Sequence, residues 1–290
     1  MLLHAGAGAV GWTDWDLEPG VVVPVLLAGI LYARGWRRPR ATHRSFFRRH
    51  APVWFWLAEV LVLLALVSPL DGFADALFSA HMAQHLVLIL VVAPLYVLGE
   101  PVIPVLRGLP RRARTAAVRA WHAVPGARAA WHVLLAPGVV FTVHMAAIWF
   151  WHFPGPYQAA LGNDAVHALE HLSFLGTAVL FWWLVMQPTG RRRLGYGQGL
   201  FFVGATLIQG GALGALLMWS STPWYPAHAA STLAMGVSPL ADQQLAGLLM
   251  WIPPGFLYIG AACGLFLAWL RDDDAKSSAA HAWRSSNAVA

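Results

Sequence analysis

Residues 78–99 read FSAHMAQHLVLILVVAPLYVLG, and this stretch decides the fold. It contains no Lys, Arg, Asp or Glu. It is long enough to supply the roughly 20 apolar residues that a helix needs to cross a bilayer. The stretch therefore predicts a transmembrane helix, with two histidines near its beginning.

Six further apolar stretches of comparable length flank this one. The predicted spans are 19–34, 52–70, 78–99, 132–152, 165–187, 197–219 and 242–270. The first is short, and the last is long enough to tilt or to kink at Pro253 and Pro254. Trp residues gather near the ends of the spans, as in the aromatic belts of membrane proteins. The sequence thus predicts an all-α polytopic membrane helix bundle of about seven transmembrane helices.

The composition agrees with a membrane protein. Of the 290 residues, 58% are hydrophobic and 11% are charged, whereas about a quarter of the residues of a soluble domain are charged. The single cysteine, Cys263, lies in an apolar run and excludes an internal disulfide framework. Residues 1–11 have no basic residue, so we expect no cleavable signal peptide. We predict an outer segment at 1–18, a membrane domain at 19–270 and a flexible cytoplasmic tail at 271–290.

The basic residues predict the orientation of the bundle. Seven arginines lie at 34–49, six at 107–128 and three at 191–193, and the last three basic residues lie at 271–284. These segments are alternate loops, and no Lys or Arg falls on the other side. By the positive-inside rule the basic loops are cytoplasmic. We therefore predict an N-terminus outside and a C-terminus inside.

Two segments outside the spans have their own patterns. Residues 110–124 are basic with interleaved Ala, Val and Trp, which predicts a short helix on the inner membrane surface. A solvated loop is the alternative. The residues after Asp272 are small and polar and predict a disordered tail.

Ionisable and soft side chains inside the spans are the candidate site residues, because polar groups in a membrane are costly and often functional. They gather on a few helices. The candidate metal-binding residues are His81, His85, His144, His167, His171, Met82, Met145, Glu170 and Asp242.

The predicted orientation places several of these residues at one level. At 1.5 Å per residue, His85 and His171 lie roughly 10 Å below the outer boundary, and His144 lies roughly 13 Å below it. Imidazole suits zinc, copper, iron and nickel, and thioether suits Cu(I). Glu170 can orient or balance the imidazoles. We therefore predict a shared metal or proton-handling site in the outer leaflet, whereas single histidines such as His4, His152 and His228 are expected to be interfacial or hydrogen-bonded rather than ligands.

Three motifs, in this order, resemble the multi-span CtaG family of cytochrome c oxidase assembly factors. They are HMAQHL at 81–86 followed by APL at 93–95, HALEH at 167–171 followed by WW at 182–183, and DQQLAGLLMW at 242–251. The resemblance covers roughly residues 20–270. It implies a bacterial plasma-membrane protein that helps to mature a haem-copper oxidase by handling copper on the outer side. The implied partners are oxidase subunits or other copper-handling proteins.

Other functions are compatible with parts of the pattern. HALEH also matches the inverted zincin motif, so a seven-helix intramembrane zinc hydrolase using His167, His171 and Glu170 is the main alternative. Paired imidazoles also hold haem. A retinal protein is excluded, because the chain's one lysine, Lys276, lies in the tail. The sequence assigns no role to residues 220–241.

Overall fold

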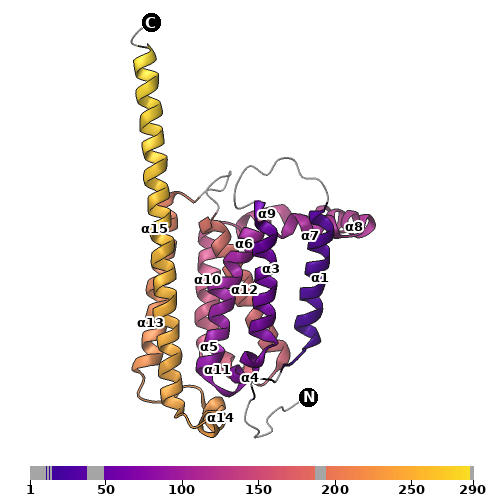
Figure 1. Cartoon of the computed structure of the whole chain (residues 1–290), viewed down its shortest axis with the longest axis vertical. Coiled ribbons are helices and arrows are strands. Elements are labelled where there is room, and N and C mark those ends of the chain that lie inside the picture. Colours follow the sequence, from indigo (N-terminus) through magenta and orange to yellow (C-terminus); the bar gives the residue numbers. More distant parts are fainter. Residues whose placement is uncertain (1–10, 12, 14, 38–48, 187–193, 288–290) are drawn as a thin grey trace.

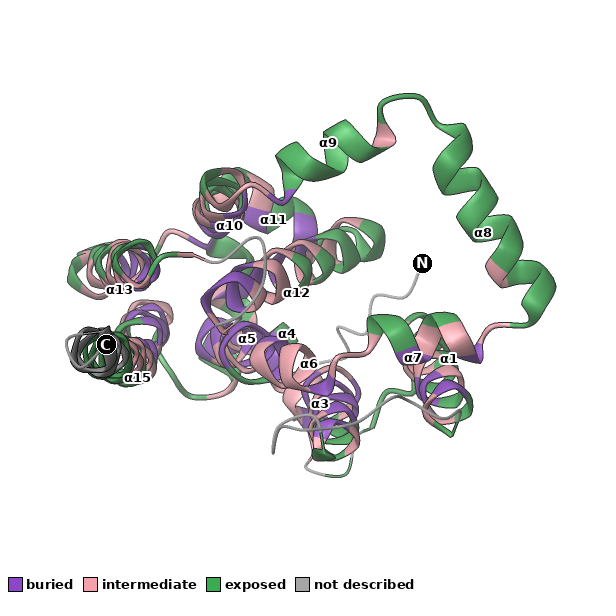
Figure 2. Ribbon diagram, turned by 90° about the horizontal axis from the view of Figure 1, so that it is seen from above, coloured by how far each residue is buried: buried purple, intermediate pink, exposed green. Residues whose placement is uncertain are grey.

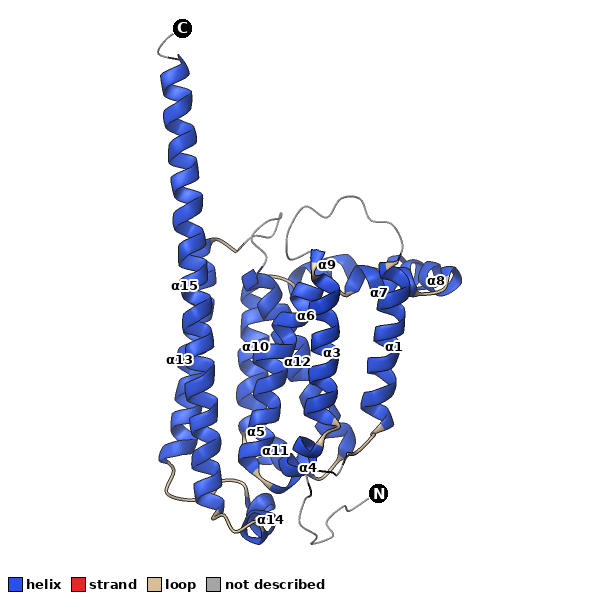
Figure 3. Ribbon diagram, viewed as in Figure 1, coloured by secondary structure: helices blue, strands red, loops and turns tan. Residues whose placement is uncertain are grey.

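The computed structural model describes residues 11, 13, 15–37, 49–186 and 194–287, and all regular structure within them is helical (Figure 3). The elements that run along the bundle are α1 Pro19–Trp36, α3 Ala51–Leu66, α5 Phe78–Leu86 with η1 Val87–Val92 and α6 Ala93–Gly99, α10 Pro137–His152, α12 Asp164–Met186, α13 Tyr196–Trp219 and α15 Pro239–Asn287. The short elements are α4 Pro69–Ala76, α7 Val102–Gly108, α8 Arg111–Ala123, α9 Ala127–Leu134, α11 Pro154–Leu161, η2 Pro226–His228 and α14 Ala229–Ala234.

The bundle has two distinct ends (Figure 1). The short helices α4, α11 and α14 lie at one end, which we call the α11 end. The helices α7, α8 and α9 lie at the other, which we call the α8 end. Seen from above, the α13–α15 pair stands on one side of the bundle and the α1–α7 pair on the opposite side, with α3, α5, α10 and α12 between them (Figure 2).

The predicted fold class is confirmed. Within the described residues, five helices are long and apolar enough to cross a membrane, and the number rises to seven if each of two bent helix pairs counts as one span. The burial pattern differs from that of a soluble protein. Phe256 and Ile208 are 75% and 73% exposed, whereas His81 and Gln84 are fully buried. Many large apolar side chains thus face outward, where lipid would solvate them, and several polar side chains are buried within the apolar core.

Two predicted spans are bent rather than straight. The second bends by 46° between α3 and α4, and the fourth bends by 68° between α9 and α10. In both cases the new helix begins at a proline, Pro69 or Pro137, after a residue with extended backbone. Proline has no N–H to donate and disfavours a helical conformation in the residue before it. The prediction of one helix over 132–152 is therefore corrected: the long helix begins at Pro137.

The C-terminal segment differs from the predicted disordered tail. Helix α15 continues beyond Asp272 to Asn287 and extends past the α8 end of the bundle (Figure 1). Lys276 and Asp272 form an ion pair of 2.8 Å at i,i+4 spacing, which supports the helix. The prolines at 253–254 lie inside α15 and do not end it.

Small residues allow the helix pairs to approach closely. A Cβ atom built on Gly247 of α15 would lie 2.5 Å from the carbonyl oxygen of Gly214 on α13. Likewise, a Cβ atom on Gly108 of α7 would lie 1.9 Å from the carbonyl oxygen of Leu31 on α1. Both contacts are backbone to backbone, so no side chain can move aside. Such small-residue interfaces are typical of helix packing in membranes.

Helices α8 and α9 extend outside the main bundle (Figure 2). None of their residues is buried. The predicted helix at 110–124 is therefore present as α8, and its placement on a membrane surface stays a prediction. The basic segments at 38–48 and 191–193 lie outside the described residues.

Candidate metal centre

Helix α5 supplies His81 and His85, and a residue of α15 fixes its beginning. The Asp242 carboxylate accepts hydrogen bonds from the backbone N–H groups of Phe78 and Ser79 at 2.7 and 3.2 Å, and from the Ser79 hydroxyl. These N–H groups have no partner within their own helix. Asp242 therefore caps α5 from a distant part of the chain, and it belongs to neither of the ligand sets that the histidines of α5 and α12 form.

Helix α12 supplies the second half of the site. The Asn163 side chain accepts hydrogen bonds from the N–H groups of Ala165 and Val166 at 3.0 and 3.1 Å, which is a typical N-terminal cap. One turn later, His167 and His171 lie on the same face with ring centroids 4.3 Å apart. The i,i+4 spacing thus places both imidazoles on the side that meets α5.

The two helices bring four imidazoles and one carboxylate together. Nε2 of His81 lies 3.9 Å from one oxygen of Glu170, and Nε2 of His85 lies 4.0 Å from the other. The His85 and His171 rings have centroids 5.0 Å apart. His81 also stacks on His167, with a centroid distance of 5.3 Å. We call these five residues, His81, His85, His167, Glu170 and His171, the histidine cluster.

Within the histidine cluster, two sets of three residues have the spacing of a metal site. His81, His85 and His171 form one set, and His81, His167 and Glu170 form the other. In each set the potential ligand atoms lie within 4.8 Å of one another. His81 belongs to both sets.

The hydrogen-bonding state of the cluster favours a bound cation. Both ring nitrogens of His81 and His85, Nε2 of His167 and of His171, and one oxygen of Glu170 are buried without a hydrogen-bond partner. Buried polar atoms left without partners cost free energy. Here the atoms belong to the imidazole and carboxylate groups that bind metals. A bound metal ion would give these lone pairs a partner, so the residues present fit such an ion.

The surrounding residues hold α5 and α12 in place. Gln84, between the two histidines of α5, donates to the Ala65 carbonyl and to Asp71, both at 2.7 Å. Two residues after His85 the helix widens into the π-helical turn η1, and Trp182 of α12 donates to the Ile89 carbonyl there at 2.9 Å. π-helical turns are often found at functional sites.

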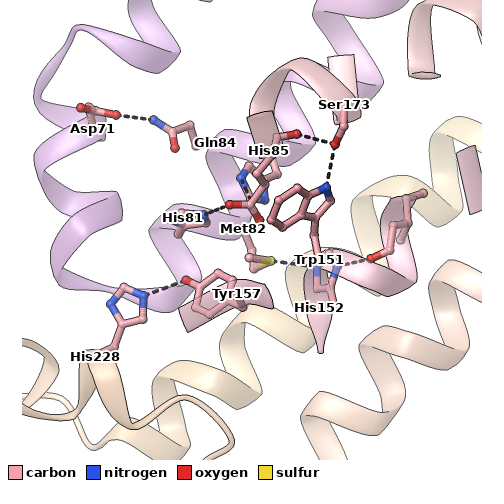
Figure 4. Close-up of polar contacts among 12 residues, drawn as sticks. Asp71, His81, Met82, Gln84, His85, Trp151, His152, Tyr157, Ser173 and His228 are labelled. Carbon is pink, nitrogen blue, oxygen red and sulfur yellow. Dashed lines mark hydrogen bonds and ion pairs between the residues drawn. The ribbon is translucent and has the colours of Figure 1, made fainter. Parts of the chain in front are cut away.

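Residues of the α11 end complete the site, and sequence reasoning missed them. The Tyr157 hydroxyl lies 2.7 Å from Nε2 of His228, and the His81 ring lies next to both (Figure 4). Burial raises the pKa of Tyr157, so its hydroxyl stays protonated and donates to His228. Burial also lowers the pKa of His228. His228 is therefore a neutral imidazole that accepts from Tyr157, and it places part of the 220–241 segment next to His81.

His152 is the second histidine that was predicted to be interfacial or hydrogen-bonded and not part of the site. It is 6% exposed, and its Nε2 atom lies 3.2 Å from the sulfur of Met82 (Figure 4). A single histidine at a helix end has no periodic pattern that sequence reasoning could have used. Its proximity to Met82 arises only from the packing of α10 against α5.

Two predicted residues lie away from the cluster. His144 is buried, contacts Thr177 Oγ1 at 3.0 Å and stacks on Phe181. Thr177 is six residues beyond His171, or about 9 Å along the helix. Met145 packs against the hydrophobic core. The structure thus groups His81, His85, His167, His171 and Glu170, places Met82 beside them, and separates His144, Met145 and Asp242.

Comparison with known proteins identifies one family. The model of the cytochrome c oxidase caa3 assembly factor family matches residues 30–272. The uncharacterized protein Mb0105 of Mycobacterium bovis is 26% identical over 265 residues, and the uncharacterized protein ML1998 of Mycobacterium leprae is 23% identical over 266. Each alignment covers 90% of this chain but 40% of the relative. No solved structure matches the chain.

Proposed function

Because the chain belongs to the family of cytochrome c oxidase caa3 assembly factors, we propose that it binds copper at the histidine cluster and delivers it to a maturing haem-copper oxidase. The cluster faces the outer side of a bacterial plasma membrane in this proposal. The receiving partner is an oxidase subunit or another copper-handling protein. The observation that carries the proposal is the set of buried, unpartnered imidazole nitrogens on α5 and α12.

The ligand types support copper. Four imidazoles dominate the cluster, and the thioether of Met82 lies on the same helix as two of them. Imidazole binds copper in both common oxidation states, and thioether selects Cu(I). The carboxylate of Glu170 lies between Nε2 of His81 and Nε2 of His85. In this position it can offset part of the charge of a bound cation.

The arrangement also supports release of the cargo. The two ligand sets share His81, so a copper ion held by His81 can exchange His85 and His171 for His167 and Glu170 one ligand at a time. Along α12, His167 is one turn closer to the α11 end than His171. Stepwise exchange would thus move the ion toward the end covered by Tyr157 and His228, where a partner could receive it.

Metal analysis of the detergent-purified full chain tests the proposal. We expect copper in the wild type and its loss in a His85→Ala, His171→Ala double variant. His144→Ala is the matched control, because His144 is buried like His85 but lies away from the cluster. Oxidase activity of cells at low copper should fall in the double variant and not in the control, while both proteins remain in the membrane.

Two results would contradict the proposal. One is wild-type copper content in the double variant. The other is normal oxidase activity at low copper despite complete loss of metal. Zinc rather than copper in the purified wild type, with normal oxidase maturation in the double variant, would favour the hydrolase alternative.

A further inference from the structure

The contact between His152 and Met82 is unusual in its hydrogen bonding. Nδ1 of His152 lies 2.6 Å from the Ile148 carbonyl oxygen, and Nε2 lies 3.2 Å from the sulfur of Met82. Both neighbouring atoms can only accept hydrogen bonds. A neutral imidazole has one N–H group and one lone pair. It can therefore satisfy one of these two contacts but not both.

The shorter contact determines where the proton lies. A carbonyl oxygen 2.6 Å from a ring nitrogen requires a hydrogen between them, because two lone pairs at that distance repel each other. Nδ1 therefore carries the hydrogen, and Nε2 directs a lone pair at the Met82 sulfur. Protonating Nε2 as well would bury a cation that forms no ion pair with any carboxylate among the described residues, and such a buried charge is costly.

A soft metal ion resolves this conflict. We propose that His152 and Met82 form a Cu(I) site of their own, distinct from the histidine cluster. Met82 and His152 are 1% and 6% exposed, so the nitrogen and sulfur atoms face each other away from solvent. Cu(I) is a soft d¹⁰ ion, and a thioether together with an imidazole is a ligand combination that suits it. Zn²⁺, which binds thiolate, imidazole and carboxylate, finds only one of its usual ligands here.

The distance between the two ligand atoms is suitable. With metal–nitrogen and metal–sulfur bonds of about 2.0 and 2.3 Å, a separation of 3.2 Å corresponds to an angle of about 95° at the ion. This angle leaves a further coordination position open. Met82 follows His81 directly in the sequence, so the pair lies beside the histidine cluster on the neighbouring face of α5. The site is thus placed to exchange Cu(I) with the cluster, although its existence does not depend on the proposed delivery to an oxidase.

X-ray absorption of the copper-loaded full chain tests this site. The parent protein carries Cys263→Ala, which removes the one cysteine sulfur, and is loaded anaerobically with excess Cu(I) and then desalted. We expect a sulfur ligand in the copper spectrum of the parent and its loss in Met82→Leu. Met145→Leu is the matched control and should keep the sulfur signal. Leucine and methionine have similar volumes, so both variants should fold, which thermal unfolding verifies.

A titration with Ag(I), a redox-inert soft ion, gives a second measurement. Met82→Leu and His152→Ala should each weaken Ag(I) binding at this site by more than the 10–100-fold typical of changes outside the ligand shell.

Copper bound only through nitrogen and oxygen in the parent would overturn the site while leaving the proposed function intact. A sulfur signal that survives Met82→Leu would overturn it too. Loss of the sulfur signal in Met82→Leu, with normal oxidase maturation in the cluster variants, would instead support the site and contradict the proposed function.

Discussion

Nε2 of His81 lies 3.9 Å from a carboxylate oxygen of Glu170, although the two residues belong to different helices. This contact joins α5 to α12 at the level where the imidazoles converge. His81 is fully buried and belongs to both sets of potential ligands, whereas each of the other four residues belongs to one. His81 is thus the central residue of the histidine cluster.

The shared position of His81 predicts an ordering among single variants. His81→Ala should weaken metal binding more than either His85→Ala or His167→Ala, because each of the latter leaves one set of three ligands complete. Competition with a chelator of known affinity, using purified protein, measures the difference. Equal losses in the three variants would show that the ligand sets are not alternatives.

Glu170→Gln distinguishes a charge-balancing group from a catalytic base. Glutamine keeps the size and one acceptor oxygen, and the set of His81, His85 and His171 stays complete, so the variant should retain metal with an affinity about 10–100-fold lower. Oxidase maturation should be partial and should improve with added copper. A general base would contribute about 10²–10⁴-fold in rate. Complete loss of function with wild-type metal content, unrelieved by copper, would therefore indicate hydrolysis.

Asp242→Ala should reduce stability and leave the metal ligands in place. It removes the acceptor for the N–H groups of Phe78 and Ser79, and loss of a helix cap costs about 0.5–2 kcal/mol. Asp242→Asn keeps one acceptor and should be less affected. Thermal unfolding measures the first effect, and metal content per folded molecule measures the second. Loss of metal in Asp242→Asn at wild-type stability would show that Asp242 is a metal ligand, as the sequence predicted.

Gly247→Ala should separate α13 from α15. The added Cβ atom would lie 2.5 Å from the Gly214 carbonyl oxygen and 2.8 Å from the Met218 nitrogen, both backbone atoms. Overpacking of this kind costs about 1–3 kcal/mol. Gly210→Ala on α13 is the control, because a Cβ atom there meets nothing within 4 Å. A thermal shift in detergent that is the same for both variants would contradict this packing.

The orientation can be tested with a reporter fused to the C-terminus. All nineteen Lys and Arg residues lie in predicted cytoplasmic segments, so the fusion should be active when the reporter requires the cytoplasm. A reporter that functions only outside the cytoplasm should be inactive. The opposite pattern would place the histidine cluster in the inner half of the membrane.

The helices were predictable because the membrane imposes a simple requirement on length and polarity. Residues 78–99 and 197–219 meet it without interruption, and both appear as long helices. The bends at Pro69 and Pro137 were less evident, since proline is also tolerated inside membrane helices. Pro24, Pro253 and Pro254 show this tolerance within continuous helices.

The candidate site was predictable only in part. The i,i+4 histidine pairs of α5 and α12 have a helical period, so their faces could be inferred from the sequence. His144 was predicted to share the site because of its estimated depth, but its side chain lies near Thr177, farther along α12 than the cluster. His152 and His228 reach the site through tertiary packing, which no local pattern records. Asp242 was predicted to be a ligand because it is an ionisable group in a predicted span. A buried carboxylate can equally well cap a helix, and the sequence does not distinguish these two roles.

The length of α15 has a mechanical consequence. A continuous helix of 49 residues is about 74 Å long, more than twice the roughly 30 Å of a bilayer's hydrocarbon layer. Its first turn holds Asp242, the cap of α5, and its far end projects beyond the α8 end. This one helix therefore connects the residue that caps α5 to the opposite end of the protein. A binding event that tilts the protruding end of α15 would therefore move Asp242. It would also move the beginning of α5, the helix that carries His81 and His85.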